Sequence, residues 1–185
     1  MIRAYRGRRP RLGAAVWVDP SAQLIGDVEL GDDASVWPLV SIRGDVNRIV
    51  IGARSNVQDN SVLHVTHDGP YSPGGVPLRI GDDVTVGHNV ILHACTVGHR
   101  CLIGMGAIVM DRAVIEDEVL LAAGSVVTPG KTLRSGWLYR GAPAQPSREL
   151  TAQERDHFLY SAQHYVRLKN HYLEEDGNRE SAVEN

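Results

Sequence analysis

Several common features are scarce in this sequence of 185 residues, and each scarcity narrows the classes of protein to consider. Two cysteines, Cys95 and Cys101, cannot form the disulfide framework of a small secreted domain, so we expect reduced thiols and a cytoplasmic protein. No apolar run approaches the roughly 18 residues that span a bilayer, and the run that follows the N-terminal arginines is too short for a signal peptide. We therefore expect neither a membrane partner nor a secretory leader.

An excess of charge of one sign is also lacking. The sequence has 19 Lys and Arg against 22 Asp and Glu, a net charge of -3, which gives no general attraction for phosphate backbones. We therefore expect no nucleic-acid partner. Because there is only one Phe but 19 Gly, the core must consist of branched aliphatic side chains packed close to small residues, and this favours short β elements.

The chain does contain a repeat of six residues. An aliphatic residue recurs at every sixth position, with a small or branched residue four places after it. The aliphatic positions are Val18, Leu24, Leu30, Val36 and Ile42; after three extra residues, Ile51, Val57 and Leu63; after a longer interruption, Ile80, Val86 and Leu92; and then, one residue early, Val97, Ile103, Val109, Ile115, Leu121 and Val127. A chain with this period must turn once per hexad, so three hexads close a triangular coil whose edges stack as parallel strands about 4.8 Å apart.

The repeat predicts one β-helical domain over residues 1–146. From Ser147 the apolar spacing becomes helical, and Thr151 and Glu154 have the spacing of a capping box. We predict a C-terminal α-helix over residues 147–174 that packs on the β-helix, followed by a polar tail over residues 175–185.

Three of the eight histidines have positions in the repeat that suggest a metal site. His64 and His93 each follow an inward-facing aliphatic residue on the same edge of successive coils, so their side chains point outward about 4.8 Å apart. His88 lies on another edge and cannot complete their site within one chain. Three copies packed around a threefold axis would bring His88 of one chain to His64 and His93 of the next, so the ligand set predicts a homotrimer with metal sites shared between subunits.

The same counting places a possible ion pair at this contact. Arg43 lies in the column of His64 and His93, and Asp59 lies in the column of His88. The two side chains are therefore predicted to meet across the subunit contact, although most such charged residues are simply solvated.

At this point the sequence resembles a known family. Arg43-Gly44-Asp45, the stretch from Arg54 to Asp59, Leu63-His64, and Gly87-His88 followed by His93 are similar to the signature of the γ-class carbonic anhydrases, over roughly residues 12–173. The resemblance implies an all-β, left-handed parallel β-helix of hexapeptide repeats with a C-terminal α-helix. It also implies a trimer that holds Zn²⁺, or alternatively Fe²⁺ or Co²⁺, on His64, His88 and His93.

The resemblance further assigns roles around that metal. It implies that Arg43 and Asp59 form the pair between subunits, that Asp45 and Asn56 support the site, and that Gln58 holds the metal-bound water or hydroxide. Three neutral imidazoles leave Zn²⁺ its full charge and an open position, which lowers the pKa of bound water to about 7. The expected activity is the reversible hydration of CO₂ to bicarbonate by this hydroxide.

The sequence departs from the family in the loop after His64, which contains no Glu to export protons. His67 is the one group in this loop whose ordinary pKa suits a proton shuttle near neutral pH, but it is equally well explained as a loop residue without a role. Tyr165, on the predicted helix, lies near the site by family analogy and either hydrogen-bonds the hydroxide or packs as an aromatic. With no strong relay, CO₂ hydration is expected to be weak.

Three other functions fit the same pattern. Hexapeptide-repeat acyltransferases bind acyl-CoA between subunits and use a histidine as general base, and fold alone does not separate them from hydratases. A metal-dependent thioesterase or other hydrolase would use the same hydroxide on an acyl carbon. A non-catalytic trimer that only binds metal is the third alternative. The three convergent histidines favour the carbonic anhydrase.

Overall fold

The computed structural model describes residues 1–183, with side chains described up to residue 176. The chain forms a series of short strands followed by one helix, α1 (Ala152–Val183). The strands are β1 (Ile2–Arg3), β2 (Arg11–Leu12), β3 (Trp17–Val18), β4 (Gln23–Leu30), β5 (Ser35–Val36), β6 (Ser41–Ile51), β7 (Asn56–Val57), β8 (Val62–His64), β9 (Leu78–Ile80), β10 (Thr85–Val86), β11 (Ile91–His93), β12 (Thr96–Val97), β13 (Leu102–Ile103), β14 (Ile108–Val109), β15 (Val114–Ile115), β16 (Leu120–Leu121), β17 (Val126–Val127), β18 (Thr132–Leu133), β19 (Trp137–Arg140) and β20 (Gln145–Glu149).

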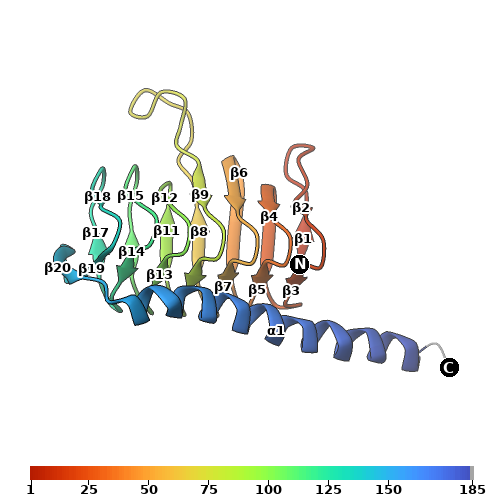
Figure 1. The fold of residues 1–185 in the computed structure, drawn as a ribbon. Coiled ribbons are helices and arrows are strands. Elements are labelled where there is room, and N and C mark those ends of the chain that lie inside the picture. The colour runs from red at the N-terminus through yellow and green to blue at the C-terminus, as the bar shows by residue number, and fades with distance from the viewer. Residues whose placement is uncertain (184–185) are drawn as a thin grey trace.

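The strands stack into a coil with a repeat of 18 residues. Val18 pairs with Val36, and Ile103 pairs with Leu121, so each residue lies beside its equivalent one coil later. Within residues 1–183, the paired strands are parallel except for β19 and β20. Figure 1 shows the coils side by side, with α1 running across them along one face. The predicted fold class is therefore confirmed: the chain is a left-handed parallel β-helix with a C-terminal α-helix.

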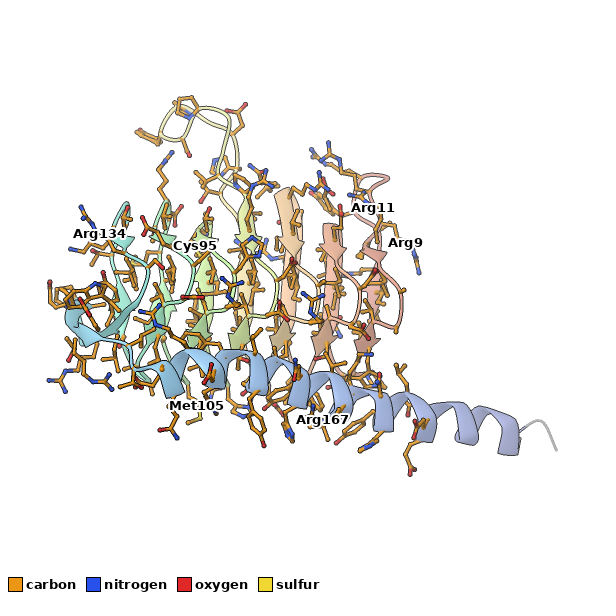
Figure 2. All side chains as sticks on the ribbon, in the orientation of Figure 1. Arg9, Arg11, Cys95, Met105, Arg134 and Arg167 are labelled. Atoms are coloured by element: carbon orange, nitrogen blue, oxygen red, sulfur yellow. The ribbon has the colours of Figure 1, made fainter. Side chains whose placement is uncertain are left out.

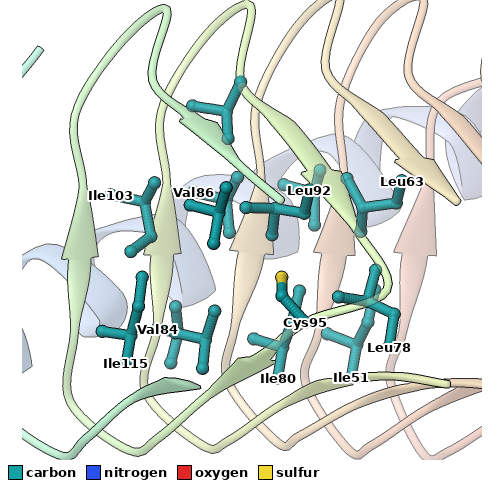
Figure 3. Close-up of a cluster of buried hydrophobic side chains, with 14 of the residues drawn as sticks. Ile51, Leu63, Leu78, Ile80, Val84, Val86, Leu92, Cys95, Ile103 and Ile115 are labelled. Carbon is teal, nitrogen blue, oxygen red and sulfur yellow. The ribbon is translucent and has the colours of Figure 1, made fainter. Parts of the chain in front are cut away.

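The aliphatic residue of each hexad points into the coil. Leu24, Ile42, Leu63 and Leu92 are fully buried, and Figure 3 shows how such side chains stack from one coil to the next. Each layer removes branched side chains from water, which stabilises the fold in proportion to the apolar area covered. The interior therefore consists almost entirely of the residues that the six-residue period selects.

Both cysteines belong to this core. Cys95 and Cys101 are buried free thiols, and burial raises the pKa of each to about 12. A thiol with so high a pKa is not a nucleophile near neutral pH. Cys95 also points into the coil beside Ile80 and Leu78 (Figure 3), so it belongs to the packing of the core.

Glycine and aspartate form one corner of the coil. A Cβ added at Gly81 would lie 2.7 Å from the backbone carbon of Gly98 on the next coil, so only glycine allows the coils to stack this closely. Beside it, Asp82 Oδ1 accepts a hydrogen bond from the backbone N–H of Ala53 at 2.8 Å. Asp82 therefore stabilises the turn at this corner.

One long loop interrupts the stack between β8 and β9. Because of this loop, residues that pair between adjacent coils are 29 positions apart in the sequence instead of 18, as His64 and His93 are. Thr66 and Val76 close the base of the loop with two backbone hydrogen bonds of 3.0 and 3.1 Å. In Figure 1 the loop extends well beyond the coils. The insertion therefore leaves the stacking of the coils undisturbed.

Helix α1 begins with the predicted capping box. Thr151 Oγ1 accepts from the backbone N–H of Glu154 at 3.2 Å, and Glu154 Oε2 accepts from the N–H of Thr151 at 2.9 Å. Phe158, Ala162 and Lys169 are the fully buried residues that face the β-helix. No helix in the described part of the chain is long and apolar enough to cross a bilayer.

The bounds of α1 differ from the predicted range of residues 147–174. The helix starts later because residues 145–149 pair with β19 as the antiparallel strand β20. It also continues to Val183, through most of the range predicted as a polar tail, and Asp176 Oδ2 accepts a hydrogen bond from Trp17 Nε1 at 3.2 Å. Helix α1 is therefore anchored on the first coil beyond residue 174, and residues 184–185 lie outside the described part.

The N-terminal arginines cover the end of the β-helix. Strands β1 and β2 pair with β4, and Figure 2 shows Arg9 and Arg11 at this end. Arg8 pairs with Asp27 at 2.8 Å and Arg11 pairs with Glu29 at 2.9 Å. This segment is therefore part of the folded domain.

Candidate metal centre

His64 and His93 lie side by side on one edge of the β-helix. They end the neighbouring parallel strands β8 and β11, whose register pairs them directly. Nδ1 of His64 is 3.2 Å from Nε2 of His93. This pair, with the groups that hold it, is called the two-histidine half-site below.

Asp45 on β6 holds His64. Its Oδ1 lies 3.1 Å from His64 Nε2, and its Oδ2 accepts from Arg43 at 2.6 Å. Burial would raise the pKa of Asp45, but the hydrogen bonds from Arg43 and His64 lower it below the usual value. Burial lowers the pKa of His64, against the opposing effect of Asp45, so this imidazole is neutral at neutral pH and able to bind a cation.

A second carboxylate, which the sequence analysis did not identify, holds His93. Asp111 Oδ1 lies 2.7 Å from His93 Nδ1, and Asp111 Oδ2 accepts from the hydroxyl of Thr66. Burial would raise the pKa of Asp111, but the hydrogen bonds from Thr66 and His93 lower it. The sequence signal for this contact is that Asp111 follows His93 by 18 residues, one coil.

His88 lies on a different edge, after β10, and has its own carboxylate. Its Nδ1 is 3.0 Å from Asp59 Oδ2. Gln58 is buried nearby, and both residues line the same groove. His88, Asp59, Gln58, Asn56 and Tyr165 are called the one-histidine half-site below.

A chain of hydrogen bonds sets the orientation of Gln58. Its Nε2 donates to Asn56 Oδ1 at 3.1 Å, and Asn56 Nδ2 donates to Thr85 Oγ1 at 3.1 Å. Thr85 Oγ1 is in turn 2.9 Å from the hydroxyl of Ser161 on α1. Gln58 Oε1 makes no hydrogen bond within the described residues, so this oxygen is the free end of the carboxamide.

Helix α1 brings Tyr165 to this half-site. Tyr165 lines the groove, of about 450 Å³, together with Gln58 and His88, and its ring packs against Trp37 with the ring centres 5.4 Å apart. Burial raises the pKa of Tyr165, and the negative charge of Asp59 raises it further. Tyr165 is therefore a neutral phenol beside His88 as well as a packing aromatic.

The residues fit a metal ion in two respects. Each of the three imidazoles has one nitrogen on a carboxylate, the usual arrangement for histidine ligands of metals. Two zinc ligands at 2.0 to 2.1 Å in tetrahedral geometry lie about 3.3 Å apart, and the facing nitrogens of His64 and His93 are 3.2 Å apart. Within one chain, however, the described residues form no group of three or more side chains placed to hold a metal.

Two of the predicted site residues make other contacts within the chain. The ion pairs of the described residues join Arg43 to Asp45 and Asp59 to His88, so Arg43 and Asp59 are not paired with each other here. His67 is exposed in the long loop and lines a hollow that Asp45 also lines. It makes no hydrogen bond or ion pair with the described residues.

Comparison with known proteins places the chain in a family. Residues 94–129 match the family model for the bacterial transferase hexapeptide (six repeats). The protein YrdA of Escherichia coli is 51% identical over 95% of each chain, and a probable carbonic anhydrase of Methanocaldococcus jannaschii is 37% identical over 83% of this chain and 92% of its own.

A solved structure is also similar along most of the chain. The crystal structure of a hexapeptide transferase family protein from Anaplasma phagocytophilum superposes with a TM-score of 0.86 at 40% identity, covering 93% of this chain and 98% of that one. The match therefore extends over the β-helix and beyond the short segment of the family model. The chain belongs to the γ-carbonic anhydrase-like family of hexapeptide-repeat proteins.

Proposed function

We propose that this protein is a γ-carbonic anhydrase-like metalloenzyme that hydrates CO₂ reversibly to bicarbonate. The observation that carries the proposal is that His64, His88 and His93 each present one nitrogen to a carboxylate, while the second nitrogens of His64 and His93 face each other at 3.2 Å. This is the donor set of an open zinc site with three imidazoles. Zn²⁺ is the proposed metal, with Fe²⁺ and Co²⁺ as alternatives.

The proposed assembly is a homotrimer in which each metal lies between two subunits. One chain carries the two-histidine half-site on one edge and the one-histidine half-site on another, so a site with three ligands needs two chains. In a ring of three copies, each edge of one kind meets an edge of the other kind on the next subunit, and the contacts close. Arg43 and Asp59 would then meet across the contact, as the sequence analysis predicts.

The surface beside each half-site supports such a contact. Val62 and Ile91, on adjacent strands next to His64 and His93, are 42% and 40% exposed. Met105, labelled in Figure 2, is 58% exposed and lines the groove beside His88. Burial of such apolar side chains between subunits is favourable, at about 25 cal/mol per Å² of apolar surface.

The metal would supply a water molecule of lowered pKa, which makes the nucleophile for CO₂ available at neutral pH. The residues of the chain orient the reactants. Nε2 of Gln58 is hydrogen-bonded to Asn56, so the free Oε1 accepts a hydrogen bond from the hydroxyl group of a reactant. This hydrogen bond fixes the direction of the lone pair on the hydroxyl oxygen. The apolar lining of the groove suits CO₂, which is uncharged.

Proton release needs a group that exchanges protons with water. We propose His67 for this role, because it is exposed and lines the hollow that Asp45 also lines. The phenol of Tyr165, neutral at working pH, is proposed to donate a hydrogen bond in the groove. The cytoplasm remains the proposed compartment, since both thiols are free.

Acyl transfer is the second candidate. The groove beside His88 is mostly apolar, and its lining by Leu102, Leu120 and Met105 suits an acyl chain. In that reaction His88 would act as general base without a metal, whereas a thioesterase or other hydrolase would need the metal.

Stopped-flow CO₂ hydration, measured with the bound metal on the same sample, separates these functions. We expect about one metal per subunit, and a loss of both metal and hydration in His88→Ala. His171→Ala, which removes an exposed histidine of α1, is the matched control and should change neither. Acetyl-CoA turnover in metal-free protein would instead support acyl transfer. Full metal content without any turnover would support a metal-binding trimer.

A further inference from the structure

Asp111 joins the metal centre to the long loop. It lies in the turn after β14, one coil beyond His93, and both of its oxygens are used. Oδ1 is 2.7 Å from His93 Nδ1, and Oδ2 accepts from the hydroxyl of Thr66 at the base of the loop. One carboxylate therefore contacts an imidazole on one side and the loop on the other.

The contact with Asp111 decides which nitrogen of His93 is free. An ionised carboxylate only accepts hydrogen bonds, so in the neutral form of the imidazole the single hydrogen lies on Nδ1. The lone pair is then on Nε2, the atom that faces His64 at 3.2 Å. Without Asp111, both tautomers would be populated and the ring would be free to rotate.

Thr66 is itself held firmly. Its backbone pairs with Val76 through two hydrogen bonds, and its carbonyl oxygen accepts from Asn47 Nδ2 at 3.2 Å. Further along, Ser72 accepts a hydrogen bond from Arg112, the residue after Asp111, at 2.7 Å. Residues 111 and 112 thus hold the loop at two separate points, of which only the first also contacts the metal centre.

We propose that Asp111, fixed by Thr66, is a positioning residue that sets the tautomer and the orientation of His93 as a metal ligand. This rests on the proposed function, because it assumes that His93 binds a metal. It adds Thr66, at the base of the long loop, and Asp111 to the residues that support the metal centre.

The test compares the full-length variants Asp111→Asn and Thr66→Val by chelator competition with Zn²⁺ and by imidazole ¹⁵N NMR of metal-free protein. We expect both variants to bind Zn²⁺ about 10 to 100 times more weakly than the parent. In the parent, His93 should be the Nδ1–H tautomer, and in Asp111→Asn it should become a mixture. Thr66→Val preserves the shape of the side chain, so its result does not depend on a tolerated change at Asp111.

Ser72→Ala is the matched control, because it releases the loop from Arg112 without touching Asp111. Its affinity for Zn²⁺ should equal that of the parent. Affinities within twofold of the parent in both test variants, or an unchanged tautomer of His93, would overturn the positioning role. If His93→Ala also binds Zn²⁺ as the parent does, the proposed function itself fails.

Discussion

The orientation of Gln58 depends on Thr85, and this dependence can be measured. Thr85→Val keeps the shape of the side chain but removes the hydroxyl that accepts from Asn56 Nδ2 at 3.1 Å and contacts Ser161 at 2.9 Å. Asn56 is fully buried, and its Nδ2 would keep only the long contact of 3.5 Å to the carbonyl of Val84. A buried donor left without a partner costs about 1 to 3 kcal/mol in the free energy of unfolding.

The same substitution should slow catalysis. With Asn56 released, the carboxamide of Gln58 loses the bond that fixes its Nε2, so the rate constant for CO₂ hydration should fall while the metal content stays constant. Ser161→Ala removes only the last member of the chain of hydrogen bonds and should have a smaller effect of the same sign.

Urea denaturation and stopped-flow hydration measure the two effects separately. Thr96→Val, at an exposed position of β12, is the matched control and should change the free energy of unfolding by less than about 0.5 kcal/mol. A Thr85→Val variant that is as stable as the parent, or that is less stable but hydrates CO₂ at the rate of the parent, would contradict this role of Thr85.

Further predictions concern helix α1 and the metal. Phe158→Ala empties a fully buried position where α1 packs on the β-helix, so it should lower the free energy of unfolding, measured by urea denaturation, by about 3 to 5 kcal/mol. Leu159 is 40% exposed, so Leu159→Ala should lower this free energy far less. Similar losses in the two variants would contradict the packing of α1. The hydrogen bond with Arg148 is the main reason why the pKa of Glu154 falls to about 2. The protein should therefore have a higher free energy of unfolding than Glu154→Gln above about pH 4.5, and this difference should vanish as the pH falls toward 2. A difference that does not depend on pH would contradict this role of Glu154. Removal of the metal with a chelator should abolish CO₂ hydration, and added Zn²⁺ should restore it; activity that survives complete removal would exclude the proposed mechanism.

The sequence predicts the β-helix well because the period of six acts at every coil. Each inward position must be aliphatic to be buried, so the pattern fixes both the core and the register, including the pairing of His64 with His93. Residue counting alone places His88 on a different edge. These features follow from the position of each residue within the repeat, so the spacing of residues in the sequence predicts them.

Other features depend on contacts that spacing does not specify. Thr66 reaches Asp111 only because the long loop closes on itself at Val76, and the course of a loop is not periodic. The start of α1 is displaced because residues 145–149 pair with β19, and its far end is held by the contact of Trp17 with Asp176. In each case a tertiary contact overrides the local preference of the chain.

Metal content of mixed trimers tests the shared site most directly. Subunits carrying His88→Ala and subunits carrying His64→Ala each lack one half-site, so trimers of either variant alone should hold no metal. In a ring with a shared site, every trimer that contains both variants regains one intact site, so refolding an equal mixture should restore about one quarter of the metal of the parent. A mixture that binds no more metal than the separate variants would contradict the account.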